Sequence, residues 1–138
     1  MQWIGCHLTI SKGYAAMGRQ ALRLGGNTAQ FFTRNPRGGA AKALDPEDMA
    51  ALNSLMADHH FGPLVAHAPY TINPCAAAEQ TLEFARMAMA DDLRRLELLD
   101  RCYYNFHPGS HVGQGLEAGI AKIAATLNQV MLPEQNTT

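Results

Sequence analysis

Four of the six histidines lie at or just after the ends of short apolar runs that are typical of β-strands. They are His7, His67, His107 and His111. A neutral imidazole nitrogen binds zinc and similar ions, and neighbouring strands of a sheet lie about 4.8 Å apart. Histidines at one level on adjacent strands can therefore reach one metal centre. The residue pattern alone leaves this metal site and a purely structural role both open.

Other side chains that follow the same runs could contact a substrate. Tyr70 comes three residues after His67, and its ring either packs on the rim of the fold or stacks on a nucleic acid. Arg37 is either a phosphate contact or a solvated loop charge, and Asn35 belongs to an ordinary Asn-Pro turn. Ser110 offers a hydroxyl and an N–H to a phosphate, although its Pro-Gly-Ser segment can equally be a simple tight turn.

Apolar runs and helical periodicities alternate four times along the chain. The predicted strands cover residues 3–8, 29–32, 64–66 and 102–106, and the predicted helices cover residues 13–24, 45–60, 76–99 and 115–129. Residues 133–138 are polar and predict no element. Strands that alternate with helices form a parallel sheet with right-handed crossovers. A small doubly wound sheet and half of a (β/α)₈ barrel both have this pattern.

The position of the histidines favours the barrel. In a (β/α)₈ barrel the chemistry lies at the carboxyl ends of the strands, and a complete barrel typically needs about 250 residues. We therefore predict an α/β fold, a (β/α)₈ TIM barrel of which only about the first four β/α units are present. Residues 1–138 form the N-terminal half of a single barrel domain in this interpretation.

Local signals support the predicted helices. Asp45 can accept from free N–H groups at a helix start, Pro46 suits the first helical position, and Asp48 matches the acidic end of a capping pattern. In the third helix, the aspartates at 91–92 can pair with the arginines at 94–95 on the solvent-exposed face.

The composition is that of an ordinary globular protein. The 138 residues carry a net charge of −1 and are 47% hydrophobic and 17% charged, so no strong positive field points to nucleic acid. The cysteines Cys6, Cys75 and Cys102 form no C-x-x-C pair, which favours a reducing compartment, and we expect Cys6 and Cys102 to be buried in strands. Without an apolar membrane span or a signal-peptide pattern, we expect a cytoplasmic protein with no membrane partner.

Four motifs stand at the predicted strand ends. They read IGCHLT at residues 4–9, FFTRNPR at 31–37, HAPYTIN at 67–73 and NFHPGSH at 105–111. Together they resemble, in the right order and over the whole chain, the endonuclease IV family of apurinic/apyrimidinic endonucleases, which is related to the xylose isomerase-like barrels. The motifs at 67–73 and 105–111 are the more specific ones.

The resemblance implies a cluster of three zinc ions in the mouth of a (β/α)₈ barrel. His67 and His107 match metal ligands of the family, and His7 matches a supporting histidine near the site. The remaining ligands of the family are carboxylates and histidines on later strands, beyond Thr138. The first of them is a glutamate that ends the fifth strand, and Glu134 does not match it because no apolar run precedes it.

The resemblance also implies a DNA partner and a reaction. Asn35 and Arg37 match a loop that lines the DNA minor groove, and Tyr70 matches an aromatic residue that helps to hold DNA open at an abasic site. The implied activity is metal-dependent hydrolysis of the phosphodiester on the 5′ side of an abasic site in double-stranded DNA, as in base excision repair. Selection of the lesion would rest on DNA deformation, because an abasic nucleotide has no base to unstack.

Two alternatives stay open. The same barrel could belong to a xylose isomerase-like sugar isomerase or epimerase, against which Tyr70 and Arg37 argue mildly because they suit a DNA partner better. Alternatively, the 138-residue chain could be a non-catalytic half-barrel that self-associates through an open sheet edge. We expect the chain alone to be inactive, with a weak, partly filled or empty metal site, because two histidines are fewer than the usual four ligands of zinc.

Overall fold

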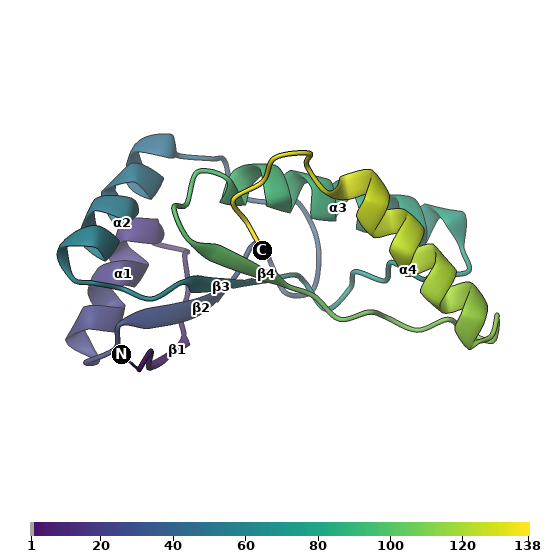
Figure 1. The fold of residues 1–138 in the computed structure, drawn as a ribbon, viewed down its shortest axis with the longest axis horizontal. Helices are drawn as coiled ribbons and strands as arrows, with labels where there is room; N and C mark the ends of the chain where they lie inside the picture. Colours follow the sequence, from purple (N-terminus) through teal and green to yellow (C-terminus); the bar gives the residue numbers. More distant parts are fainter. Residues whose placement is uncertain (1) are drawn as a thin grey trace.

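The computed structural model describes residues 2–138, which form four strands that alternate with four helices (Figure 1). The order is β1 (Gly5–His7), α1 (Tyr14–Arg23), β2 (Thr28–Phe32), α2 (Pro46–Asp58), β3 (Leu64–His67), α3 (Glu79–Leu96), β4 (Cys102–Asn105) and α4 (Leu116–Val130). The predicted alternation is confirmed, and the element ends differ by a few residues. The largest differences are in α3, which begins at Glu79 instead of residue 76 and ends at Leu96 instead of residue 99.

The strands form one parallel sheet in chain order, β1-β2-β3-β4. His7 pairs with Gln30, Gln30 with Val65, and Val65 with Tyr103, so these four residues form one row across the sheet. A doubly wound sheet would reverse its strand order part-way across, and this sheet does not. The unbroken order is that of a partial (β/α)₈ barrel, and it brings all four carboxyl strand ends to one edge.

Helices α1, α2 and α3 cover one face of the sheet with a dense apolar core. From the strands, Phe31, Leu64 and Ala66 are fully buried in it. The helices contribute Met17, Ala21, Met49, Leu52, Met56 and Leu96. Helix α4 packs mainly against α3, in a second cluster that contains Ala85, Ala88, Met89 and Val130. Burying a side chain of this size contributes about 1.5–3 kcal/mol, so this face holds the half-barrel together.

The opposite face of the sheet, which we call the open face, has no covering layer within residues 2–138. Its central row is His7, Gln30, Val65 and Tyr103. Tyr103 is 48% exposed, and all three residues of the edge strand β1 are exposed. In a closed barrel this face lines the interior, where side chains of other strands fill the space.

The three cysteines are unpaired in the structure. Cys102 is buried as predicted, and burial raises the pKa of its thiol to about 12. The prediction that Cys6 is buried was wrong. It lies in β1, which has a neighbouring strand on one side only, so its side chain stays exposed.

The C-terminal residues return to the sheet, although the sequence predicted no element for them. The N–H of Thr138 donates to the Cys102 carbonyl (3.1 Å), and the N–H of Tyr104 donates to the Thr138 carbonyl (2.7 Å). This is the bonding pattern of a parallel ladder, so Thr138 occupies the free edge of β4. The Glu97 carboxylate accepts from the N–H groups of Asn136 and Thr137 at 2.8 and 3.0 Å, and thereby fixes the segment to the end of α3.

The start of α2 confirms one capping prediction and changes another. The Asp45 side chain accepts from the Asp48 N–H at 3.1 Å, with Pro46 in the first turn, as expected. The Asp48 carboxylate instead reaches α1, where it accepts from the N–H groups of Tyr14 and Ala15. One aspartate therefore joins the amino ends of two helices. None of the helices within residues 2–138 is long and apolar enough to span a membrane.

Candidate functional site

His67 and His107 lie next to each other at the carboxyl ends of β3 and β4. Their ring centroids are 5.2 Å apart. His67 is the last residue of β3 and only 6% exposed, whereas His107 lies two residues beyond β4 and is exposed. The structure thus brings together the two histidines that the sequence predicted as metal ligands, one held in the fold and one at its surface.

The hydrogen bond of His67 determines which ring nitrogen is free. Its Nδ1 lies 2.6 Å from the carbonyl oxygen of Ala68. A carbonyl oxygen only accepts, so in the neutral ring Nδ1 carries the proton and Nε2 keeps its lone pair. Histidines that bind metals commonly donate their second N–H to a carbonyl or carboxylate in this way. The arrangement around His67 therefore fits a metal ligand.

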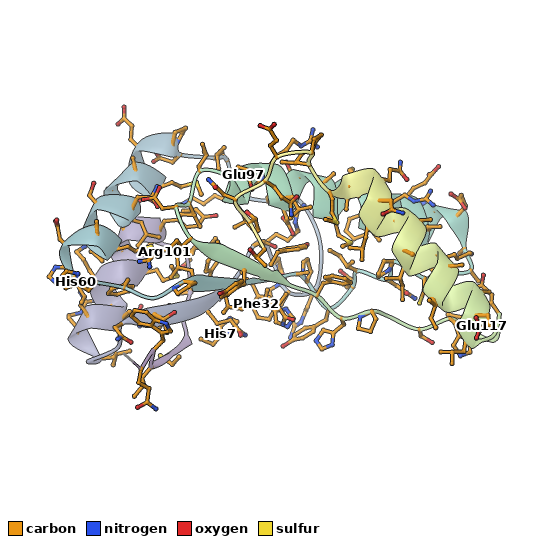
Figure 2. The ribbon with its side chains drawn as sticks, in the orientation of Figure 1. His7, Phe32, His60, Glu97, Arg101 and Glu117 are labelled. Carbon is orange, nitrogen blue, oxygen red and sulfur yellow. The ribbon has the colours of Figure 1, made fainter. Side chains whose placement is uncertain are left out.

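Phe32 connects the site residues of three strands, although the residue pattern predicted no role for it. Its ring lies 4.6 Å from that of His7, 5.1 Å from that of His67 and 5.2 Å from that of Tyr70. Figure 2 shows His7 and Phe32 together below the strands, far from His60 at the end of α2. The signal that could have found Phe32 is its position, since it is the last residue of β2 and pairs with His67.

His7 takes a supporting position beside this ring cluster. Gln30 Nε2 lies 3.0 Å from His7 Nδ1. Desolvation, followed by repulsion from His67, lowers the pKa of His7 below its ordinary value. The ring is therefore neutral at neutral pH, and Nδ1 accepts from the Gln30 amide in that form.

Tyr70 is 63% exposed, yet its ring contacts both histidines of the pair. The centroid distances are 5.5 Å to His67 and 5.7 Å to His107. Its backbone N–H donates to the Pro36 carbonyl at 3.0 Å, which ties the β3–α3 loop to the β2–α2 loop. An exposed ring held beside two imidazoles offers a stacking surface at the mouth of the site.

Asn35 and Arg37 lie in the β2–α2 loop, and both are exposed. The Asn35 side-chain oxygen accepts from the Arg37 N–H at 2.9 Å, which forms a local turn. No hydrogen bond or ion pair of the Arg37 guanidinium is seen within residues 2–138. The structure places this pair beside Tyr70 through the bond at Pro36, and leaves the cation facing solvent.

Ser110 lies on the β4–α4 loop, three residues after His107. Its backbone N–H and carbonyl both pair with the side-chain amide of Asn73, at 3.2 and 3.0 Å. Its hydroxyl oxygen accepts from the Val112 N–H at 3.3 Å. Both backbone groups of Ser110 are thus engaged, which leaves the hydroxyl as the polar group that it can offer to a ligand.

A buried ion-pair network anchors the β2–α2 loop to α3. Asp92 is fully buried and accepts from Arg34, from the Thr33 hydroxyl at 2.7 Å and from the Tyr104 hydroxyl at 2.9 Å. Arg34 also reaches Asp91 at 2.9 Å. The prediction that both aspartates of α3 pair with arginines on its solvent-exposed face was therefore wrong for Asp92. The helical periodicity could not reveal that its partner follows β2, 58 residues away.

Within residues 2–138, no cluster of three or more metal-binding side chains occurs. His59 and His60 lie at the other end of the fold, after α2. The Nδ1 of His111 accepts from the Gly115 N–H at 3.3 Å and so closes a local turn. His67 and His107 are thus the two predicted metal ligands, and their rings lie next to each other.

Comparison with known proteins agrees with this arrangement. A family model described as "Xylose isomerase-like TIM barrel" matches residues 19–138. The chain belongs to this xylose isomerase-like TIM barrel family. Two relatives named "Probable endonuclease 4" are each 55% identical to it. The protein of Alkaliphilus oremlandii aligns over 98% of this chain and 48% of its own length, and that of Akkermansia muciniphila over 99% and 50%.

Among solved structures, this member of the xylose isomerase-like family is similar to an endonuclease IV. The crystal structure of endonuclease IV from Thermus thermophilus superposes with a TM-score of 0.82 at 30% identity, and the match covers 98% of this chain and 49% of that one. A D-psicose 3-epimerase superposes with a TM-score of 0.57 at 11% identity, which shows the shared fold alone. The chain spans about half the length of the relatives it matches.

Proposed function

We propose that this chain is the N-terminal half of a metal-dependent apurinic/apyrimidinic endonuclease that hydrolyses DNA on the 5′ side of an abasic site. The observation that carries the proposal is the contact of His67, His107 and the exposed Tyr70 ring at one sheet edge. The 55% identity to proteins named endonuclease 4 supports it. An epimerase function has no comparable support, because the likeness of this chain to the D-psicose 3-epimerase is limited to the fold.

His67 and His107 are the proposed zinc ligands of this half. His67 supplies Nε2, since its Nδ1 donates to the Ala68 carbonyl. Zinc in such a site supplies Lewis acidity and an activated water for phosphodiester hydrolysis. His7 supports the site from β1 through Phe32 and is not itself a proposed ligand.

The proposed DNA contacts lie around the same edge. Arg37 would contact phosphate as a cation, and Asn35 shapes its turn. Tyr70 would help to hold the DNA open where the abasic nucleotide is extruded, and Ser110 would offer its hydroxyl to the phosphate. Because the net charge of the chain is −1, the selectivity would depend on how easily the abasic site deforms and less on charge attraction.

The chain alone is proposed to be inactive. A tightly held zinc ion takes about four protein ligands, and the pair described above provides two. The other half of a barrel would supply the remaining carboxylates and histidines, which is consistent with relatives that are twice as long.

A chimera tests the proposal. The second half of the Thermus thermophilus endonuclease IV would follow Thr138, and the product would be assayed on a duplex with one abasic site, with and without a chelator. We expect cleavage 5′ to the lesion that the chelator abolishes, and no cleavage by the 138-residue chain alone.

The variants His67→Ala and His107→Ala of the chimera should each lose roughly 100-fold or more of the rate. His59→Ala is the matched control, because His59 lies at the opposite end of the fold, and its rate should stay within about twofold of the parent. A chimera that folds and binds zinc, but leaves the abasic duplex intact, would rule out the proposed function.

A further inference from the structure

Asn73 connects the loop of His67 and Tyr70 to the loop of His107. Its side-chain amide donates from Nδ2 to the Ser110 carbonyl at 3.0 Å, and its Oδ1 accepts from the Ser110 N–H at 3.2 Å. The amide thus pairs with one residue in both directions, as a neighbouring strand would. Asn73 lies in the β3–α3 loop and Ser110 in the β4–α4 loop, so the pairing joins the two loops that carry the candidate metal ligands.

Gly109 shows how closely the two loops approach. A Cβ atom on this residue would lie 2.0 Å from Asn73 Oδ1, and Gly109 adopts a φ of +84°, which favours glycine. The residue between His107 and Gly109 is Pro108, whose ring fixes one backbone angle. The segment from His107 to Ser110 therefore has little freedom once its far end is paired with Asn73.

Cys75 strengthens the same junction. Its N–H donates to Asn73 Oδ1 at 3.2 Å, and its buried thiol lies 3.3 Å both from that oxygen and from the Pro108 carbonyl. Asn73 Oδ1 is thus held by donors from both loops. An amide with this many partners has one orientation, because any rotation would leave several donors unsatisfied.

We propose that Asn73 is a positioning residue that sets the distance between His67 and His107 by locking the β4–α4 loop onto the β3–α3 loop. The inference rests on the proposed metal-binding function of the two histidines. Asn73 does not touch the metal in this proposal. It acts through the Pro-Gly-Ser segment, which holds the exposed His107 at 5.2 Å from the buried His67.

The chain contains a matched control for this role. The Asn53 amide also pairs with backbone in both directions, donating to the Leu98 carbonyl at 2.8 Å and accepting from the Asp100 N–H at 3.2 Å. It joins α2 to the α3–β4 loop, at the amino end of β4 and away from the histidines. Asn53→Ala and Asn73→Ala therefore remove the same kind of interaction at opposite ends of the sheet.

The test is a Zn²⁺ titration of the 138-residue chain, followed by the ¹⁵N signals of the imidazoles. We expect Asn73→Ala to weaken Zn²⁺ binding at His67 and His107 by about tenfold or more, as loss of partners behind a ligand typically does. Asn53→Ala should leave the affinity unchanged while lowering the stability of the fold. The inference is overturned if both variants bind Zn²⁺ like the parent, or if both weaken it equally.

A double-mutant cycle tests the contact without metal. Gly109→Ala should destabilise the parent chain more than it destabilises the Asn73→Ala variant. Only in the parent would the added methyl group collide with the side-chain amide of Asn73. The backbone strain at φ +84° is common to both and cancels. Equal losses in both backgrounds would contradict the proposed junction.

Two further results keep the outcomes distinct. If Asn73→Ala does not fold, hydrogen exchange of the parent decides, since the Ser110 amide should exchange more slowly than that of His111, and equal rates would overturn the inference. If the parent shows no Zn²⁺ response at either histidine while the cycle shows the contact, the inference is overturned and Asn73 is a structural residue only. The proposed function is judged separately, by cleavage of the abasic duplex by the chimera.

Discussion

At the scale of single residues, the site depends on side chains whose conformational freedom is restricted by neighbouring groups. His67 has one ring nitrogen bonded to the Ala68 carbonyl, and its ring contacts those of Phe32 and Tyr70. A ligand held in one tautomer and one orientation loses little entropy when it binds an ion. The ring nitrogens of His107 have no hydrogen-bond partner among the described residues, so the position of His107 depends on the loop that carries it.

The Arg34–Asp92 pair gives the first residue-scale prediction. Asp92→Ala leaves the buried Arg34 guanidinium with Asp91 as its remaining carboxylate partner, so we expect the free energy of unfolding to fall by about 3 kcal/mol in a denaturant titration. Asp91→Asn, at a half-exposed position, should cost about 1 kcal/mol or less. A loss at Asp92 no larger than the loss at Asp91 would show that the network contributes little.

Phe32 gives a second one. Phe32→Ala removes the ring that touches His7, His67 and Tyr70, and should destabilise the chain by about 2–3 kcal/mol because Phe32 is only partly buried. It should also broaden the imidazole signals of His67 in NMR spectra, since that ring loses a neighbour. The control is Phe84→Ala. Phe84 is also partly buried but lies on α3, and its loss should leave the His67 signals sharp.

The sequence predicted the local parts of this site better than its long-range parts. The histidines, Tyr70 and the capping role of Asp45 could be read from strand ends and turn patterns, which depend on neighbouring residues. The role of Asp92 could not be predicted, because its partner Arg34 is distant in sequence and helical periodicity does not distinguish a solvated aspartate from a paired one. Asn73 is the last residue of the motif at 67–73, but its bonds to Ser110 depend on how two loops meet.

At the scale of elements, the strands place the site and the loops complete it. β3 and β4 bring their ends to one level, and the helices behind them fix the sheet. The element order and bounds were predictable because apolar periodicity and turn residues are local signals. The exposure of β1 and the return of the C-terminal residues to β4 were not, because both depend on which strand neighbours are present.

The attachment of the C-terminal segment predicts a pH dependence. Desolvation raises the pKa of Glu97, but the N–H donors of Asn136 and Thr137 outweigh it and hold that pKa below its ordinary value of 4.5. A carboxyl group whose pKa is lowered by folding stabilises the structure above its unfolded pKa, and this contribution disappears as the pH falls through the lower folded value.

Hydrogen exchange of the Tyr104 amide measures this effect, because that N–H donates to Thr138. Its protection factor should be constant between about pH 7 and pH 5 and should fall below about pH 4.5. In Glu97→Gln the protection should be lower by a few-fold at pH 7 and should lack the same acid transition. An unchanged transition in this variant would assign the pH dependence to other carboxyl groups, such as Asp91.

At the scale of the whole molecule, the half-barrel exposes surface that a closed barrel buries. The open face carries Tyr103, the edge strand β1 has unpaired backbone groups on one side, and Ile4 beside it is 59% exposed. Such edges and apolar surfaces tend to pair with another chain. The edge of β4 is already occupied by Thr138, so β1 is the free edge.

We therefore predict that the 138-residue chain on its own associates with a second copy through β1 and the open face. Sedimentation velocity should show a concentration-dependent shift from monomer to dimer in the micromolar range. Tyr103→Lys should move the equilibrium toward monomer by about tenfold, whereas Met87→Lys, on the exposed surface of α3, should not. A chain that stays monomeric at several hundred micromolar would contradict this prediction.

The claim that His67 and His107 form one metal-binding pair is tested most directly by a Zn²⁺ titration in which the ring signals of all six histidines are followed together. We expect His67 and His107 to shift at the same Zn²⁺ concentration, before His7, His59, His60 and His111. His67→Ala should abolish the response of His107 as well, because a single imidazole binds Zn²⁺ weakly. Independent responses of the two rings, or stronger binding at His59 and His60, would contradict the claim.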